Sequence, residues 1–375
     1  MNMKQKVLNL IMFFSNWVIN TFGVKPWLSI RLLTDLTFIN SPSYYPEKKR
    51  KSKLCIVFDN LVLIWKYARI EEFYFAYGMD VKGADIKSFV DYNEFSYWRD
   101  KLNKQKGKPF EYTGILRDKF VFNLFSTGLS FPSSSMIGLI FKGTIFQLTH
   151  KKEMPLSEYF DLNNVDAFCK AIDAEDGKSI YHIVSNNGKI YMNGTNVSID
   201  FLLSELGNVR WTIEHKIIQH PEYAKFNPCS VNTLRIYTVR DVSTGEIRFL
   251  PSIFRVGAWG NNVDNWARGG LIIRIYEDGS LGEYGFFRPK YGTKATIHPD
   301  TGIVFKGQKL PFAKESFEFV KKMHCYLYGI HSIGWDIAVT ESGPIVVEAN
   351  DNWEISALQI ASKGCQKEFD LYFKG

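Results

Sequence analysis

The sequence is poor in cysteine and histidine, and neither residue type recurs at a spacing that builds a metal site. Its five cysteines are scattered, and their odd number argues against a disulfide framework. The seven histidines include no HExxH-like pair. These absences argue against a structural or catalytic zinc site and favour a reducing, cytoplasmic compartment. A Ser-His-Asp or Cys-His signature is also missing.

Long apolar runs and low-complexity tracts are absent as well. The apolar stretch near the N-terminus is interrupted at Ser15 and Asn16, is too short to span a bilayer, and lacks a convincing signal-peptide cleavage site. Hydrophobic residues make up 45% of the 375 residues and charged residues 23%, so disorder is not expected. A chain of this length and composition predicts two or three packed subdomains.

The net charge of +7 is concentrated near the N-terminus. Residues 1–60 contain nine Lys and Arg against three acids, so this segment carries +6 and the remaining 315 residues carry +1. The excess predicts either an anionic partner or a solvated face. Nucleic acid is not expected as that partner, because the rest of the chain is nearly neutral and lacks a recognition motif.

Residues 1–22 have apolar side chains at helical spacing, from Val7 and Ile11 to Val18 and Phe22. Two interpretations stay open. The helix packs on the protein's own core, or it lies on a membrane surface with the help of the basic cluster Lys48–Lys53, which places the protein at the inner face of the cell membrane. Residues 41–53 form a polar connector.

The rest of the pattern indicates the α+β class, with antiparallel hairpins. Residues 54–60 are compatible with a strand or a helix, and residues 66–110 read as mostly helical. Asn187-Gly188, Thr244-Gly245 and Asp278-Gly279 separate alternating segments and predict three hairpins. Further helices are expected at residues 118–128, 314–328 and 355–361.

The most informative segment is GWDIAVTESGPIVVEAN, residues 334–350. Glu348 and Asn350 are two residues apart and therefore share one face of a strand. A turn at Ser342 would place Asp336 opposite them, so that two carboxylates and an amide converge. Mg²⁺ takes hard oxygen ligands of this kind. The alternative is a hairpin with ordinary solvent-facing acids, and the surrounding valines and isoleucines argue against it.

This hairpin resembles the metal-binding hairpin of ATP-grasp enzymes. More narrowly, it is similar to the sugar-transfer-associated ATP-grasp proteins of bacterial cell-surface polysaccharide biosynthesis. The resemblance extends over roughly residues 110–360 through three segments: residues 211–220, residues 227–240 and residues 254–270. It implies an ATP-grasp fold in which two α+β subdomains enclose ATP. We therefore expect an N-terminal segment (1–110), a lid subdomain (111–210) and a core subdomain (211–375).

The resemblance also implies roles for individual residues. The metal ligands would be Asp336, Glu348 and Asn350, with ATP and Mg²⁺ as cofactors. The nucleotide would be bound by eight residues: Lys119, Lys170, Gly177, Glu214, His215, Lys216, Ile217 and Glu222. The phosphoryl and acceptor groups would be contacted by Arg235, Asn265 and Arg268. The chain departs from the family pattern after Lys170, where Ala171 replaces a common proline and Gly177 is the one glycine of the loop.

The implied reaction joins a carboxylate to an amine. The carboxylate attacks the γ-phosphate of ATP, and the amine then displaces phosphate from the acyl phosphate. The expected partners are a carboxylate substrate such as a uronic-acid-containing glycan, and an amino acid or amino sugar. Two alternatives stay open, namely a kinase on the same fold and a non-catalytic module that binds nucleotide or glycan.

Overall fold

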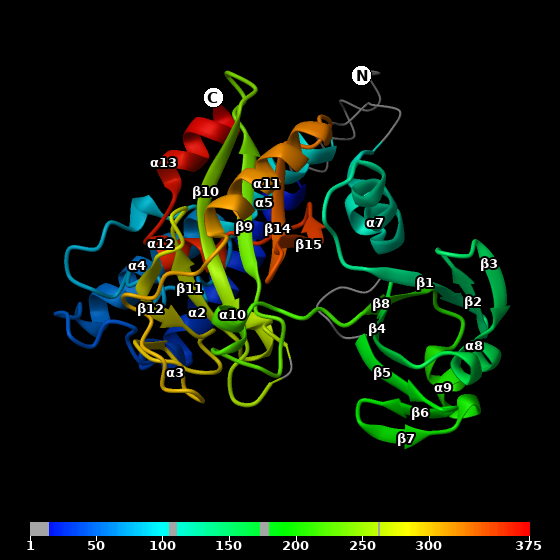
Figure 1. Ribbon diagram of the computed structural model, residues 1–375. Helices are drawn as coiled ribbons and strands as arrows, with labels where there is room; N and C mark the ends of the chain where they lie inside the picture. The colour runs from blue at the N-terminus through cyan, green and yellow to red at the C-terminus, as the bar shows by residue number, and fades with distance from the viewer. Residues whose placement is uncertain (1–14, 105–110, 173–179, 262) are drawn as a thin grey trace.

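The computed structural model describes residues 15–104, 111–172, 180–261 and 263–375. Two antiparallel sheets lie side by side, and helices cover their faces (Figure 1). The predicted α+β class is confirmed. The first 14 residues, which hold much of the predicted N-terminal helix, lie outside the described residues.

The smaller body of the molecule is built on an eight-stranded sheet, here called the lid sheet, with the order β3-β2-β1-β8-β4-β5-β6-β7. Its strands are β1 (Met136–Phe141), β2 (Thr144–Gln147), β3 (Lys152–Pro155), β4 (Val165–Ala171), β5 (Ile180–Asn186), β6 (Lys189–Met192), β7 (Thr195–Val197) and β8 (Trp211–His215). Two helices, α8 (Leu156–Leu162) and α9 (Ile199–Leu206), bury apolar residues in the core of this body. The opposite face of the sheet carries Asp166, Phe168 and Lys170 of β4.

The larger body is built on a seven-stranded sheet, here called the core sheet, with the order β13-β12-β11-β10-β9-β14-β15. Its strands are β9 (Leu234–Arg240), β10 (Ile247–Val256), β11 (Leu271–Ile275), β12 (Leu281–Phe286), β13 (Lys294–Ala295), β14 (Ser332–Thr340) and β15 (Gly343–Asn350). Eight of the nine β14 residues are buried, because helices pack on both faces of this sheet.

Two hydrophobic clusters sandwich the core sheet. The first contains residues of α6 (Thr113–Arg117), α7 (Lys119–Gly128), α10 (Pro221–Ala224) and α11 (Ala313–Tyr326). The second contains residues of α4 (Lys53–Tyr67), α5 (Tyr92–Lys104), α12 (Ser356–Ser362), α13 (Gln366–Phe369) and the short π-helix η4 (Asp370–Lys374). Leu116 and Phe122, which precede the lid strands, therefore pack against the core sheet. The domain boundaries expected from the sequence stay predictions.

The N-terminal segment is part of the larger body. Its elements are the π-helix η1 (Ile19–Val24), α2 (Lys25–Thr34), α3 (Leu36–Ile39), α4 (Lys53–Tyr67) and the 3-10 helix η2 (Ile86–Ser88). The connector at residues 41–52 precedes α4, whose start is capped by Ser52 accepting the Cys55 N–H. Tyr44, Phe73 and Phe95 of this segment pack in the second cluster with Tyr237 of β9.

The ambiguous run at residues 54–60 is helical, because Ile56, Leu63 and Ile64 repeat at helical spacing and are buried along one side of α4. The expectation of mostly helical structure over residues 66–110 is wrong for residues 71–91, which form turns and the short helix η2. Aromatic packing stabilises this stretch instead. The ring centroids of Phe73 and Trp266, for example, are 5.5 Å apart.

The three predicted hairpins are present as β5–β6, β9–β10 and β11–β12. Asn187 and Gly188 both have positive φ, at 49° and 74°, which suits the two-residue hairpin turn between β5 and β6. The helices predicted at residues 118–128, 314–328 and 355–361 correspond to α7, α11 and α12.

Asn103, at the C-terminal end of α5, attaches the N-terminal segment to the core sheet. Its buried side chain donates to the carbonyls of Ser332 and Asp351 at 3.0 and 3.1 Å. Its amide oxygen accepts the N–H groups of His331 and Ser332 at 3.1 and 2.9 Å. The amide group of Asn103 thus forms hydrogen bonds with backbone groups at the start of β14 and after the end of β15.

We predict that Asn103→Ala lowers the free energy of unfolding by about 2–4 kcal/mol, because buried backbone donors and acceptors lose their partners. Chemical denaturation would measure this loss. Asn93→Ala, at an exposed position of the same helix, is the matched control and should change stability by less than about 0.5 kcal/mol. Equal effects of the two substitutions would contradict the attachment role.

Candidate functional site

A narrow cleft lies where the two sheets meet. The lid sheet contributes Lys170 of β4 and Glu214 of β8, and the core sheet contributes Glu348 of β15. The other lining residues come from α7, from the segment before β1 and from β15: Lys119, Phe122, Asn123, Ser133, Ser134, Val346 and Val347. Four residues that the sequence assigned to nucleotide or metal therefore line one cleft.

The two bodies are joined at this cleft by backbone hydrogen bonds. The Val346 N–H donates to the Pro132 carbonyl at 3.0 Å, and the Ser134 N–H donates to the Val346 carbonyl at 3.3 Å. These bonds place the chain that enters β1 beside the edge strand β15. The floor of the cleft is thus fixed by main-chain contacts rather than by side chains alone.

Lys170 points into the cleft because of strand alternation. Its neighbours Cys169 and Ala171 are buried in the lid core, so Lys170 lies on the opposite face of β4. There its Nζ is 2.7 Å from Oε2 of Glu214. Burial of Glu214 raises its pKa, but Lys170 and hydrogen bonds from Ser134 and Thr212 outweigh the burial, and the net pKa is lowered. Glu214 is therefore ionised at neutral pH.

Lys119 lies at the first position of α7 and reaches across to the lid. Its Nζ donates to the carbonyls of Ala171 and Ile172, both at 3.1 Å. Its ammonium group therefore sits at the end of β4, close to Lys170 in the same cleft. Gly177, predicted to belong to the phosphate loop, lies outside the described residues.

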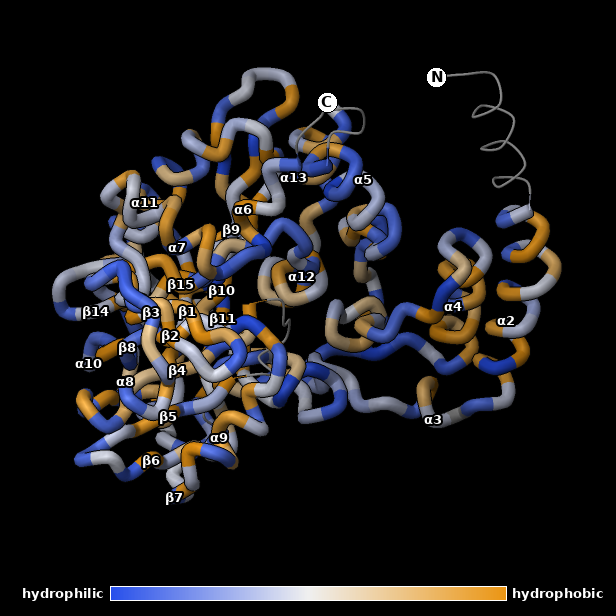
Figure 2. The backbone as a smooth tube through the Cα atoms, turned by 90° about the vertical axis from the view of Figure 1, so that its right-hand side faces the viewer, coloured by the Kyte–Doolittle hydropathy of each residue, from blue (hydrophilic) through white to orange (hydrophobic). Residues whose placement is uncertain are grey.

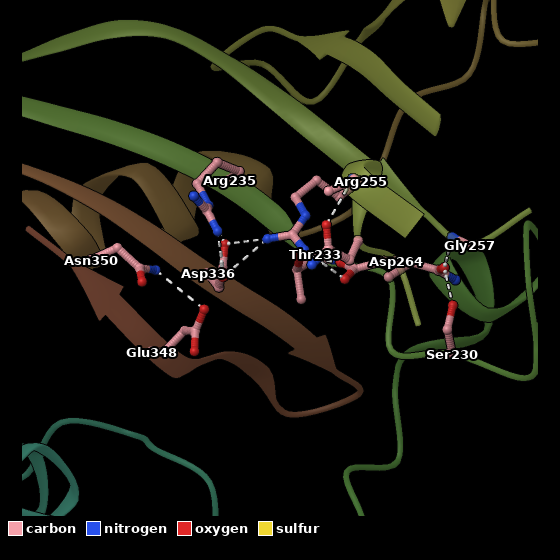
Figure 3. Close-up of polar contacts among 12 residues, drawn as sticks. Ser230, Thr233, Arg235, Arg255, Gly257, Asp264, Asp336, Glu348 and Asn350 are labelled. Atoms are coloured by element: carbon pink, nitrogen blue, oxygen red, sulfur yellow. Dashed lines mark hydrogen bonds and ion pairs between the residues drawn. The ribbon is translucent and has the colours of Figure 1, made fainter. Parts of the chain in front are cut away.

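Next to the cleft, the carboxylate of Asp336 holds two arginines (Figure 3). Arg235 of β9 donates to both carboxylate oxygens, with Nη2 2.7 Å from Oδ2. Arg255 of β10 also contacts both oxygens through Nη1, at 3.2 and 3.1 Å. Burial would raise the pKa of Asp336, but the two guanidinium groups hold it well below its usual value. Asp336 is therefore ionised throughout the physiological range.

The network continues to a second buried acid. Arg255 Nη2 lies 3.0 Å from Oδ1 of Asp264, and Oδ2 of Asp264 accepts the Thr233 N–H at 3.1 Å. Burial raises the pKa of Asp264, and the positive charge of Arg255 opposes this. Arg255 and Asp264 were missed by the sequence reasoning. The available signal was that both lie in the segment 254–270 that supported the resemblance.

Glu348 lies directly opposite Asp336 in the β14–β15 register, as the hairpin predicted. Its pKa is raised to about 7 by burial and by the nearby negative charge of Asp336. The amide nitrogen of Asn350 donates to Oε1 of Glu348 at 3.2 Å. The three predicted metal ligands thus lie together, Asn350 and Glu348 on one strand and Asp336 on the next.

This donor set fits a hard divalent cation. It offers carboxylate and amide oxygens, and the raised pKa of Glu348 shows a negative charge that lacks full compensation. Asp336 fits less directly, because both of its oxygens contact arginines. Within the described residues, no group of three or more His, Cys, Asp and Glu side chains is placed to hold a metal. A metal ion at the predicted residues would therefore also need the amide oxygen of Asn350 and oxygens of a bound substrate or nucleotide.

The other predicted residues lie elsewhere. The N–H groups of His215 and Lys216 donate to the carbonyls of Ser135 and Asp166, at 2.9 and 3.2 Å, so they form part of the lid sheet. Ile217 follows them, after the end of β8. Glu222 does not line the cleft: it lies in a separate depression and pairs with Lys225 at 2.6 Å.

Asn265 begins the 3-10 helix η3 (Trp266–Arg268), where its side chain accepts the Ala267 N–H at 2.8 Å. Arg268 is exposed at the end of this helix. Gly270 is required here because a Cβ would lie 2.6 Å from the Asp264 carbonyl oxygen. The structure therefore places Asn265 and Arg268 on a loop beside the Asp264 end of the network, and not in the cleft.

The raised pKa of Glu348 predicts a pH dependence of stability in metal-free protein. The unfolded glutamate ionises near 4.5 and the folded one near 7. Between these values the folded state binds the extra proton, so stability falls as pH rises through this window. We predict that Glu348→Gln reduces this loss in the free energy of unfolding by about 2 kcal/mol. The variant should therefore be more stable than the unsubstituted protein at pH 8, but not below pH 4.5.

Thermal unfolding with a chelator present, at pH values across this window, measures the difference. Glu341→Gln, at the exposed turn of the same hairpin, is the matched control. A difference between Glu348→Gln and the unsubstituted protein that is constant with pH would contradict the assignment.

Comparison with known proteins identifies the family of the chain. The sequence model of the family described as sugar-transfer associated ATP-grasp matches residues 99–368. No curated protein matches the chain. Two similar solved structures are D-alanine–D-alanine ligase from Bacillus anthracis with ATP, and N5-carboxyaminoimidazole ribonucleotide synthetase from Thermotoga maritima.

Both structures are remote. The ligase has 13% identity and a TM-score of 0.38, over 70% of this chain and 66% of its own. The synthetase has 13% identity and a TM-score of 0.36, over 68% of this chain and 48% of its own. The chain thus spans about half to two thirds of their lengths. The family match covers more than two thirds of the 375 residues, and the chain belongs to the sugar-transfer associated ATP-grasp family and has its fold.

Proposed function

We propose that the chain is an ATP-dependent, ADP-forming carboxylate–amine ligase that makes an amide through an acyl phosphate. The observation that carries the proposal is the cleft between the two sheets. It combines Lys170 of the lid sheet and Lys119 of α7 with the incompletely compensated carboxylate of Glu348 on β15, and two arginines lie beside it. Phosphoryl transfer needs this combination of cations around the transferred group.

The lysines would bind the phosphates of ATP. A triphosphate carries more negative charge than one metal ion compensates, and Lys119 and Lys170 lie in the cleft with their ammonium groups at the end of β4. In the structure Lys170 pairs with Glu214, so ATP would share or replace this partner. Glu214 would hold Lys170 in position and contact the adenine side of the nucleotide.

Asp336, Glu348 and Asn350 would hold Mg²⁺, which supplies charge neutralisation at the phosphates when bound. Asp336 also orients Arg235 and Arg255 through four contacts. Arg235 would donate to the transferring phosphoryl group, where a guanidinium contacts two oxygens and stays charged. Asp336 would thus keep the arginine in place before the nucleotide arrives.

The proposed acceptor is a carboxylate of a uronic-acid-containing glycan or its precursor, and the amine comes from an amino acid or an amino sugar. The family description links the chain to sugar transfer, which supports a carbohydrate acceptor. Asn265 and Arg268, with the glycines that follow them, would approach the acceptor beside Asp264. The product would belong to a bacterial cell-surface polysaccharide.

The test is orthophosphate and ADP release from MgATP with mixed uronic acids, with and without amino acids and amino sugars. We expect orthophosphate release to require both a carboxylate and an amine. ADP formation without orthophosphate would indicate a kinase instead. MgATP protection against thermal unfolding without any turnover would indicate a nucleotide-binding module.

Glu348→Gln should lower turnover by about 100-fold or more, because a metal-binding charge is lost. The folded state should persist, since Asn350 and the strand register remain. Asp336→Ala is a poorer test: it leaves Arg235 and Arg255 as buried charges without their shared partner, so it should unfold the protein as well. Normal turnover in folded Glu348→Gln would exclude the metal role.

Lys170→Met should weaken ATP binding by about 10- to 100-fold, because a charge-assisted contact in a partly buried site is lost. Titration calorimetry with a non-hydrolysable ATP analogue measures this effect. Lys189→Met, at an exposed position of β6 in the same sheet, is the matched control. Lys170→Met leaves Glu214 without its ion-pair partner and should also lower stability. The double variant Lys170→Met/Glu214→Gln should regain this stability but not the affinity for ATP. This difference separates phosphate binding from the ion pair.

A further inference from the structure

Exposed apolar side chains are enriched in the N-terminal helices of this protein. Of 28 large hydrophobic residues that are exposed among the described residues, ten lie between residues 15 and 67. These belong to the N-terminal helices, and α2 packs along α4. Figure 2 shows the two helices side by side, with apolar segments along both.

Helix α4 is apolar on two opposite sides. One side is buried through Ile56, Leu63 and Ile64. The other presents Leu54, Phe58, Val62 and Trp65 at spacings of four, four and three residues, and Leu54 and Phe58 are 82% and 67% exposed. A surface helix of a water-soluble protein normally places polar residues on its outer side. The outer side of α4 is therefore built to contact something apolar.

Helix α2 extends the same surface. Trp27, Ile30 and Leu33 recur every three residues and are 55–62% exposed. Arg31, on the same helix, lies 5.5 Å from the ring of Trp27. We call the outer sides of α2 and α4, from Trp27 to Leu33 and from Leu54 to Trp65, the apolar face. Tryptophan beside arginine is typical of segments that lie at a membrane–water interface.

The charge around the apolar face is positive. Residues 15–67 contain eight Lys and Arg and three acids. Ion pairs join Glu47 to Lys294 and Asp59 to Lys51, both at 2.7 Å, and Arg50 to Asp80 at 3.0 Å, so the net charge of the segment stays positive. A second copy of this chain docked face to face would bring two positive surfaces together. An anionic lipid surface has both the apolar layer and the opposite charge.

We propose that α2 and α4 form a docking surface for membranes whose lipids carry anionic headgroups. The contact is peripheral: among the described residues no helix is both long and apolar enough to cross a bilayer. The surface precedes the family match, which starts at residue 99, so it is a feature of this chain outside that match. The proposal does not rest on the ligase activity.

The placement of the apolar face is compatible with catalysis at a membrane. Figures 1 and 2 show α2 and α4 on the opposite side of the core sheet from the lid strands β5–β7. A protein docked through the apolar face would keep its lid sheet away from the bilayer. The lid would then be free to move when nucleotide binds.

The test is flotation of the full chain with vesicles of phosphatidylcholine, with and without phosphatidylglycerol. We expect binding to the vesicles that contain phosphatidylglycerol and a decrease of binding with added salt. Phe58→Glu/Trp65→Glu should lower the partition coefficient by about tenfold or more, because two apolar side chains lose their burial in lipid. Leu162→Glu, at an exposed apolar residue of α8, should bind as the unsubstituted protein does.

Three outcomes would overturn the proposal. The full chain does not float with either kind of vesicle. Phe58→Glu/Trp65→Glu binds the vesicles as well as the unsubstituted protein does, including the case in which only removal of residues 1–22 abolishes vesicle binding. Sedimentation shows a dimer that Phe58→Glu/Trp65→Glu dissociates, which would identify a second copy as the occupant. Thermal unfolding of the double variant checks that the fold persists.

Discussion

The site depends on one buried carboxylate, that of Asp336. Three antiparallel strands converge on it: β14 carries it, β9 places Arg235 opposite it, and β15 places Glu348 opposite it on the other side. Two buried guanidinium groups are stable only with a negative partner nearby, since a charge removed from water is costly without compensation. Asp336 supplies that partner to Arg235 and Arg255 at once. The two arginines compensate the charge of Asp336 itself, whereas the pKa of Glu348 is raised to about 7.

The cleft follows from how the two sheets are joined. The chain enters the lid beside β15, through backbone bonds between Pro132, Ser134 and Val346, and leaves it after β8. The lid is therefore fixed at the cleft floor, while its outer strands lie away from the larger body (Figure 1). Lys119 and Lys170 meet at this junction, so the contacts between them depend on the relative position of the two bodies.

The N-terminal segment has two roles in the structure. Its inner side completes the hydrophobic cluster on one face of the core sheet, through residues such as Tyr44, Phe95 and the hydrogen-bonding side chain of Asn103. Its outer side carries the apolar face. The two interpretations that the sequence left open for residues 1–22 stay predictions, because residues 1–14 lie outside the described residues.

The sequence alone determined the elements whose signals are local. The hairpin at Asn187-Gly188 follows from residues that adopt positive φ, and the opposition of Asp336 and Glu348 follows from strand alternation across a short turn. These features need only neighbouring residues, and the resemblance to the family added the fold.

Tertiary structure decided what depends on partners far along the chain. Residues 54–60 became helical because Ile56, with Leu63 and Ile64, is buried along one side of α4, and an apolar run by itself does not distinguish helix from strand. Arg235 and Asp336 are 101 residues apart, and Lys170 and Glu214 are 44 apart. Sheet order brings these pairs together, and it also separates Glu222 from the cleft. Non-local strand pairing carries no signal in a short stretch of sequence, so the charge network became visible only in the folded chain.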